Sequence, residues 1–241
     1  MTDTVRLAKY LAERLACSRR EAENYVEGGW VSVNGEVVEE AGFRIGPDAQ
    51  VDVSPKARPE DVKPVTILLH KPAGYGASPG SHSAAELLVP ANLSPNDRSG
   101  LRVLKKHLSE LALATPLETD ASGLVVLTQE RSIHRKLVED AARIEEEFVV
   151  EVSGALSADG LKRLNHGLSW QGKPLAPIKV SWQSDNHLRF ALKTPPLGQI
   201  AYMCQQVGLT VHSMRRIRIG RLPVAGLAPG QWRYLLGYER F

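Results

Sequence analysis

The chain has 241 residues, of which 43% are hydrophobic and 24% are charged, and its formal net charge is +3. This composition is ordinary for a globular protein and excludes a fibrous repeat or a wholly disordered chain. No apolar run approaches the roughly 20 residues of a membrane span, and Met1–Leu15 lacks the apolar segment of a secretory signal. We therefore expect a cytoplasmic protein that contacts no membrane. Cys17 and Cys204 lie far apart and no cysteine or histidine shows metal-ligand spacing, which predicts reduced thiols and no metal.

Residues 1–54 predict two helices followed by a small sheet. Leucines at every fourth position predict an amphipathic helix over Val5–Ala16. Ser18, followed three residues later by Glu21, is the capping-box pattern that begins a second helix, which should end at Gly28 and Gly29. Asn34-Gly35 between valine-rich runs predicts a type I′ hairpin.

The charge of this segment restricts how it could bind RNA. Residues 1–54 contain six Arg and Lys residues against ten Asp and Glu residues, so binding would need a local basic face. Arg19 and Arg20 lie in the first turn of the second helix, where each cation opposes the helix dipole at a cost of about 0.3–1 kcal/mol. With the free N–H groups of a helix start, they would form a competent phosphate site. A pair of solvated surface arginines fits the local chemistry equally well.

Three runs in this segment resemble the alpha-L RNA-binding domain first described in the fourth small-subunit ribosomal protein. They are Arg6–Leu11, Ser18–Ala22 and Gly29–Gly35. The resemblance covers about residues 5–53 and implies recognition of folded RNA by shape and phosphate contacts. It makes Arg6, Lys9, Arg19 and Arg20 candidates for RNA contact.

A second domain is expected over residues 65–241. Residues 55–64 are rich in proline and charge, which predicts a linker. Beyond it, strands and helices mix without a regular βαβ repeat, which favours an α+β domain with a mostly antiparallel mixed sheet. The expected strands are Val65–Leu69, Gly123–Leu127, Phe148–Val152, Lys179–Trp182 and Leu188–Leu192. The expected helices are Ser132–Ala142, Ser157–His166 and Ile200–Val207.

Several motifs of this domain, in their order behind an alpha-L domain, resemble the RsuA/RluF-type RNA pseudouridine synthases over nearly the whole chain. They are Lys71–Gly74, Asp120–Thr128, Gln199–Met203, Val211–Arg221 and Pro229–Arg233. The resemblance implies isomerisation of a uridine in ribosomal or transfer RNA, without a cofactor, by an aspartate nucleophile acting on a flipped-out nucleotide. It implies structured RNA, above all ribosomal RNA, as the partner of a protein that we expect to be a monomer.

The residues at the chemical centre depart from the family pattern. Glu118 stands at the position of the nucleophilic aspartate, and its carboxylate is one methylene further out; a displacement of about 1 Å can cost roughly a hundredfold in rate. An arginine of the same motif is replaced by Pro116. Phe148 replaces a tyrosine and could stack on a base, but it has no hydroxyl for proton transfer. Leu197–Met203 has none of the three arginines of the corresponding family motif, including the one that pairs with the aspartate.

Further residues could contact RNA in the second domain. Lys71 lies beside a proline turn. The sequence is equally compatible with a Lys71 that lines an RNA groove and with a solvated loop at this place. Arg215, Arg216 and Arg218 lie in a strand pattern whose isoleucines should face the core, which predicts a basic strand face for RNA. The four tryptophans are predicted to be core residues more than base-stacking platforms.

Three functions remain compatible with the sequence. The leading hypothesis is an RNA-binding protein of this family with weak or no isomerase activity. The first alternative is an active synthase that uses Glu118, and the second is a non-catalytic adaptor in ribosome assembly or translation. Asp120 is a weaker candidate nucleophile because two extended residues place it about 6.6 Å from Glu118, so we expect it to serve in a turn.

Overall fold

The computed structural model describes residues 4–76 and 82–241. Its internal contacts divide the chain into two compact units. Unit 1 comprises Met1–Pro64 and Leu101–Leu111, and unit 2 comprises Val65–Gly100 and Ala112–Phe241. Residues 101–111, predicted from the sequence to be part of the second domain, thus pack with the first unit. The limits at residues 54 and 64 remain predictions.

Two helices of unit 1 pack against each other, α1 (Leu7–Leu15) and α2 (Arg19–Glu27). The first begins later than predicted, because Val5–Arg6 form strand β1 and pair with β4 (Arg44–Ile45). The predicted capping box of α2 is confirmed: the Ser18 hydroxyl accepts a hydrogen bond from the Glu21 N–H, and the Glu21 carboxylate accepts one from the Ser18 N–H.

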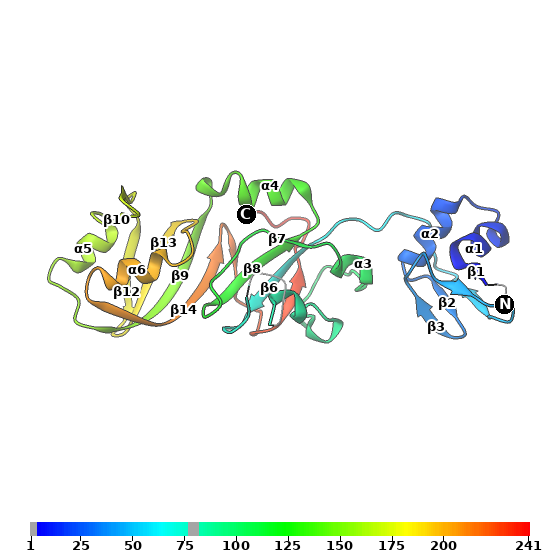
Figure 1. The fold of residues 1–241 in the computed structure, drawn as a ribbon, viewed down its shortest axis with the longest axis horizontal. Helices are drawn as coiled ribbons and strands as arrows, with labels where there is room; N and C mark the ends of the chain where they lie inside the picture. Colours follow the sequence, from blue (N-terminus) through cyan, green and yellow to red (C-terminus); the bar gives the residue numbers. More distant parts are fainter. Residues whose placement is uncertain (1–3, 77–81) are drawn as a thin grey trace. The chain divides into compact units, whose positions relative to one another are not determined.

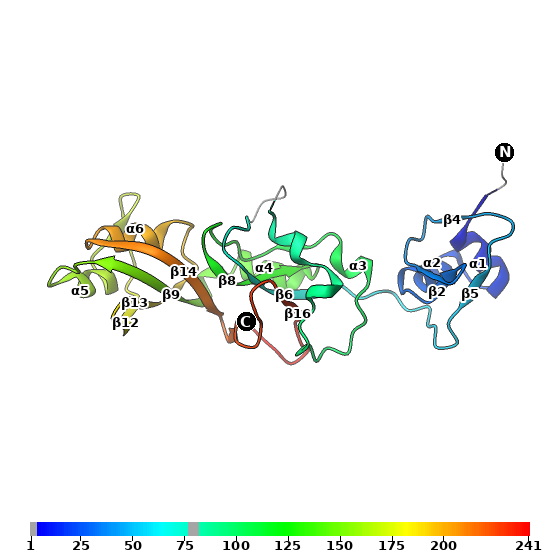
Figure 2. The same cartoon turned by 90° about the horizontal axis from the view of Figure 1, so that it is seen from below.

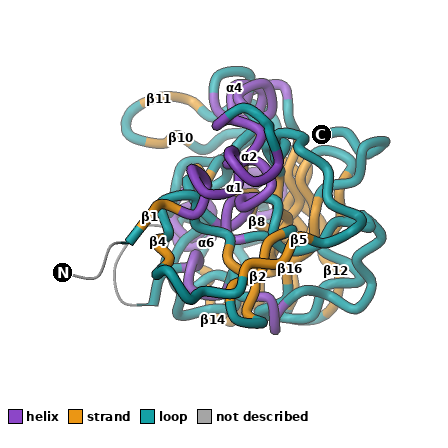
Figure 3. Tube along the Cα trace, turned by 90° about the vertical axis from the view of Figure 1, so that its right-hand side faces the viewer, coloured by secondary structure: helices purple, strands orange, loops and turns teal. Residues whose placement is uncertain are grey.

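The sheet of unit 1 has three strands, β2 (Val31–Val33), β3 (Glu36–Val38) and β5 (Val51–Val53), in the order β3-β2-β5. Asn34 and Gly35 both have positive φ angles, 52° and 87°, as the predicted type I′ turn requires. Buried side chains of both helices and of these strands form one core. Figure 3 shows α1 and α2 side by side beside β2 and β5. Unit 1 also contains the short helix α3 (Lys105–Leu108).

Unit 2 is built on a nine-stranded sheet whose path runs β12-β13-β9-β14-β8-β6-β16 (Figure 1). Only the pairing of β14 with β8 is parallel among the described strand pairs, so the predicted α+β class with a mostly antiparallel sheet is confirmed. The strands on the path are β6 (Thr66–Lys71), β8 (Ser122–Thr128), β9 (Glu145–Gly154), β12 (Lys179–Ser184), β13 (His187–Lys193), β14 (Leu209–Ile219) and β16 (Trp232–Tyr234). The short strands β7 (Ala112–Leu113) and β15 (Leu222–Pro223) pair with β8 and β14.

The helices of unit 2 are shorter than the sequence predicted. They are α4 (Arg131–Val138), α5 (Gly160–Asn165) and α6 (Gln199–Gln205), with 3-10 turns η1 (Ala84–Leu87), η2 (Pro90–Asn92) and η3 (Ala141–Arg143). Leu137 of α4 joins a core cluster with Leu68 of β6 and Val126 of β8. Figure 2 shows α6 lying over β14, against which it packs. A hairpin of β10 (Ser169–Trp170) and β11 (Lys173–Pro174) was not predicted. No helix among the described residues is long and apolar enough to cross a membrane.

Candidate functional site

Glu118 lies in a tight turn between β7 and β8, which the Ala121 N–H closes by donating to the Glu118 carbonyl at 3.1 Å. Its half-buried carboxylate accepts a hydrogen bond from the Gly198 N–H at 2.9 Å. Gly198 has φ of 84°, a conformation that strains residues with a side chain. The backbone amide of Gly198 therefore contacts the carboxylate from the position where the resemblance implies an arginine. Asp120 is exposed in the same turn, as predicted.

Lys71 is buried, with 1% of its surface exposed. Its Nζ lies within hydrogen-bonding distance of the carbonyls of Tyr75 (2.7 Å), Ala121 (2.7 Å), Thr119 (3.1 Å) and Pro72 (3.2 Å). Burial, reinforced by the charge of Arg216, lowers the pKa of Lys71 to about 8, although Glu118 and Asp120 oppose the shift. Lys71 was expected to line an RNA groove or to lie in a solvated loop. Its ammonium is instead enclosed by carbonyls and holds the turn that carries Glu118, and its contact with RNA stays a prediction.

Arg216 is also buried, with 3% of its surface exposed, and it is not the surface RNA contact that the sequence predicted. Its guanidinium donates to the carbonyls of Thr115 (2.6 Å), Leu124 (2.8 Å) and Pro116 (3.1 Å). It also pairs with the buried Glu146 carboxylate at 3.2 Å. Lys71 and Arg216 thus bind carbonyls on the two sides of Glu118 and fix the backbone around it.

A β-bulge explains why the arginines of β14 do not form one basic face. The register of β14 against β9 shifts between Arg216 and Arg218. Arg216 consequently meets Glu146, whereas Arg218 meets Glu147, which lies on the other face of β9. Arg215 is exposed, and its contact with RNA stays a prediction.

Arg218 belongs to an ion-pair network rather than to an open surface. Its Nη2 lies 2.6 Å from Glu145 and 2.5 Å from Glu147, and Arg189 also pairs with Glu147. Burial opposes ionisation of Glu147, but hydrogen bonds from Arg218 and Arg189 hold its pKa below the usual value. Arg218 would have to leave these partners to bind a phosphate.

Phe148 occupies the expected place in β9 beside the Arg216 guanidinium, whose Cζ lies 5.9 Å from the ring centroid. The ring is only 2% exposed. A base could therefore stack on it only if the groups that cover it move, and the stacking role remains a prediction.

An aromatic pair lies next to Gly198. The rings of Trp170 and Tyr202 meet edge to face with centroids 5.0 Å apart, and Trp170 approaches to 3.9 Å of the point where a Cβ of Gly198 would lie. Both rings are half-buried. Trp170, predicted to be a core residue, is only half-buried, whereas Trp232 is fully buried as predicted. The sequence signal for this pair is Tyr202, an aromatic residue at a position where the resemblance implies an arginine.

The candidate RNA contacts of unit 1 are exposed. Arg6 and Lys9 lie at the start of α1, and Arg19 and Arg20 at the start of α2. Arg19 pairs with Glu23 at 3.3 Å, and Arg20 pairs with Asp61 at 2.9 Å. Ion pairs this exposed contribute little to stability.

The S4 domain family model matches residues 5–51. This match confirms the predicted RNA-binding domain of ribosomal-protein type.

Similarity to known proteins extends over the whole chain. An uncharacterised RNA pseudouridine synthase of Aquifex aeolicus is 28% identical over 241 residues, covering 98% of this chain and 94% of the relative. The dual-specificity RNA pseudouridine synthase RluF of Escherichia coli K12 is 26% identical, covering 98% and 77%. Ribosomal large subunit pseudouridine synthase B of Bacillus subtilis is 26% identical, covering 97% and 93%.

A solved structure described as a pseudouridylate synthase superimposes with a TM-score of 0.60 at 19% identity, covering 96% of each chain. This likeness shows a shared fold. Together with the sequence relatives, it confirms the predicted resemblance.

Proposed function

We propose that this chain, an S4-domain protein related from end to end to the RNA pseudouridine synthases, binds structured ribosomal RNA in the cytoplasm and has weak or no isomerase activity. The observation that carries the proposal is the surroundings of Glu118. Its carboxylate accepts a hydrogen bond from the Gly198 amide, while the nearby Arg216 is committed to three carbonyls and Glu146.

The reaction makes demands that these residues meet poorly. Pseudouridine formation breaks the N1–C1′ bond of uridine and joins C5 to C1′. C5 releases its proton and N1 takes one up, so that the product is an isomer of uridine. The glutamate at position 118 is one methylene too long, and a displacement of about 1 Å can cost roughly a hundredfold in rate. Phe148 has no hydroxyl to accept or donate a proton, which forgoes a contribution of about 10²-fold or more from acid–base catalysis.

RNA binding rests on separate residues. The exposed cations of unit 1, namely Arg6, Lys9, Arg19 and Arg20, are available to phosphates at the starts of two helices. Arg215 adds an exposed cation in unit 2. None of these contacts needs a cofactor or a second copy of the chain, in keeping with a monomer.

Tritium release tests the proposal. Large-subunit ribosomal RNA labelled at C5 of uridine is incubated with the protein, and binding is measured in parallel. We expect RNA binding with release at least about a hundredfold slower than that of an active synthase such as RluF. Release at a comparable rate would overturn the weak-activity proposal, and absence of binding would overturn the RNA-binding one.

The active-synthase alternative is favoured by one observation, namely that Lys71 and Arg216 fix the backbone on both sides of a retained carboxylate. It makes a distinct prediction. If Glu118 is the nucleophile, Glu118→Gln abolishes whatever release the parent shows, whereas Asp120→Asn leaves it unchanged. Equal rates for the parent and Glu118→Gln would remove Glu118 from the chemistry.

A further inference from the structure

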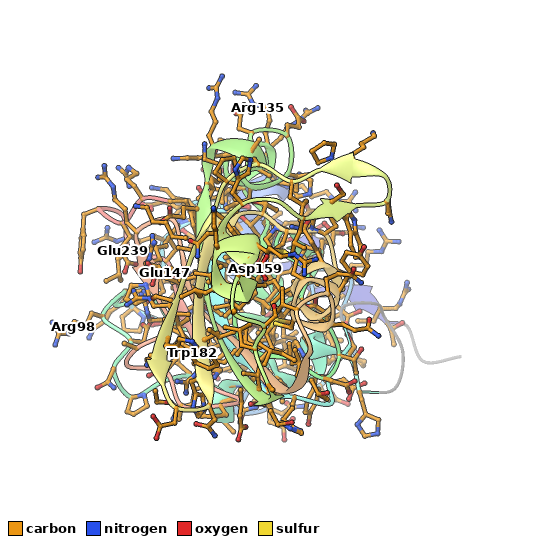
Figure 4. The ribbon with its side chains drawn as sticks, turned by 90° about the vertical axis from the view of Figure 1, so that its left-hand side faces the viewer. Arg98, Arg135, Glu147, Asp159, Trp182 and Glu239 are labelled. Carbon is orange, nitrogen blue, oxygen red and sulfur yellow. The ribbon has the colours of Figure 1, made fainter. Side chains whose placement is uncertain are left out.

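Four exposed cations from three elements of unit 2 line one pocket of about 470 Å³. Arg135 and Lys136 come from α4, Arg143 from η3, and Arg221 from the turn between β14 and β15. Figure 4 shows Arg135 at the top of the view, pointing away from the ribbon. We call this set the α4 pocket.

The α4 pocket lies on the face of the sheet opposite to the side chain of Lys71. In β6, Leu68 packs in the same cluster as Leu137 of α4. Lys71 follows three residues later in the same strand, and side chains three apart in a strand point to opposite faces. Since Lys71 holds the Glu118 turn, the α4 pocket is a separate place from the candidate catalytic residues.

The cations of the α4 pocket are available to a ligand. Within residues 4–76 and 82–241, the structure gives none of the four side chains a hydrogen bond or an ion pair. Two carboxylate side chains also line the pocket, Asp140 and Glu145, and Glu145 is already paired with Arg218. The lining therefore carries an excess of positive charge.

Stabilisation of the helix dipole explains only two of the four cations of the α4 pocket. Arg135 and Lys136 lie in the last turn of α4, where cations stabilise the helix dipole. Arg143 and Arg221 lie outside that helix, yet they reach the same pocket. Arg131 in the first turn opposes the dipole of α4 and lines an adjoining pocket that shares Arg135.

We propose that the α4 pocket is a second RNA contact, which binds backbone phosphates of the RNA on the face away from Glu118. Three guanidinium groups suit phosphate oxygens because each can donate two parallel hydrogen bonds. The inference rests on the proposed RNA-binding function. It adds a site that neither the S4 domain nor the Glu118 region provides.

The test compares two variants of equal charge loss in the full chain. The pocket variant is Arg135→Ala/Arg143→Ala/Arg221→Ala. The matched control, Arg98→Ala/Lys162→Ala/Lys173→Ala, removes three exposed cations elsewhere in unit 2. Figure 4 labels Arg98 well apart from Arg135. Binding of protein-free large-subunit ribosomal RNA is measured over a series of salt concentrations, and circular dichroism checks that both variants fold.

We expect the slope of log K against log salt to fall by about 2–3 in the pocket variant, at roughly 0.7–0.9 per lost phosphate contact. In the control variant this slope should fall by less than about 1. The charge-preserving variant Arg135→Lys/Arg143→Lys/Arg221→Lys should keep most of the slope.

Equal slopes for the pocket variant and the control would overturn the inference while leaving the proposed function intact. Absence of RNA binding by the parent would overturn both. Binding of poly-glutamate that RNA does not displace, and that the pocket variant loses, would reassign the pocket to an acidic protein and would also overturn the inference.

Discussion

Lys71 is a charged residue that is almost completely buried, and this burial determines its pKa. Burial removes water from the ammonium, and the carbonyls around it, although well placed, are dipoles and not charges. The pKa of Lys71 consequently falls from 10.5 to about 8. Between these two values the unfolded chain holds a proton at this site that the folded chain has lost.

This difference predicts how stability depends on pH. Because the unfolded state binds more protons between pH 8 and 10.5, the contribution of Lys71 to the free energy of unfolding should rise with pH in that range. The rise is at most about 3 kcal/mol. Urea unfolding of the parent and of Lys71→Met at several pH values measures it as a growing difference in favour of the parent.

An exposed lysine supplies the control for that measurement. Lys162→Met removes a lysine whose side chain is exposed and shows how much the loss of one lysine by itself changes the pH dependence. A difference between the parent and Lys71→Met that stays constant from pH 8 to 10.5 would contradict the buried ammonium.

At the scale of elements, the parallel pairing of β8 with β14 depends on a glycine. Gly123 has φ of 123°, and a Cβ there would lie 2.2 Å from the Arg216 carbonyl oxygen and 2.5 Å from the Arg216 nitrogen. The close approach brings the backbone of Arg216 next to β8, where its side chain reaches the carbonyls around Glu118. A side chain at Gly123 would therefore separate the two strands.

We predict that Gly123→Ala destabilises the protein by roughly 4 kcal/mol or more, because backbone strain and a clash with backbone add up. Gly226→Ala is the matched control, since Gly226 has φ of 85° but open space around it. It should cost only about 1 kcal/mol from strain. Urea unfolding at one temperature compares them, and similar losses would show that the close approach is unimportant.

Features that depend on neighbouring residues could be predicted from the sequence, whereas features that depend on distant residues could not. The capping box at Ser18 and the turn at Asn34-Gly35 depend on neighbouring residues, so their signals are local and were found. The burial of Arg216 depends on carbonyls and a carboxylate some 70 to 101 positions away. The alternation of arginines and isoleucines along β14 predicted that Arg216 and Arg218 share one exposed face. A β-bulge between these two residues interrupts the alternation, and nothing in the strand pattern itself marks that bulge.

For the molecule as a whole, unit 1 is not one continuous stretch of chain. Residues 101–111 leave unit 2 after Gly100 and pack against α2 and its following turn. The Arg102 guanidinium lies over the Trp30 ring, 4.5 Å from its centroid, and donates to the Gly28 carbonyl. Lys106 pairs with Glu27. A domain limit drawn from the S4 match alone therefore omits part of the packing of this unit.

Arg102→Ala should accordingly loosen unit 1 and leave the sheet of unit 2 unaffected. It removes a cation–π contact and a hydrogen bond to a carbonyl, together about 1–2 kcal/mol. Hydrogen exchange of the full chain, followed by mass spectrometry, should show faster exchange over residues 19–31 and unchanged exchange in β6 and β8. Arg98→Ala, which removes an exposed cation from unit 2, should leave residues 19–31 unchanged. If Arg102→Ala also leaves them unchanged, the contacts of Arg102 with Trp30 and Gly28 do not stabilise unit 1.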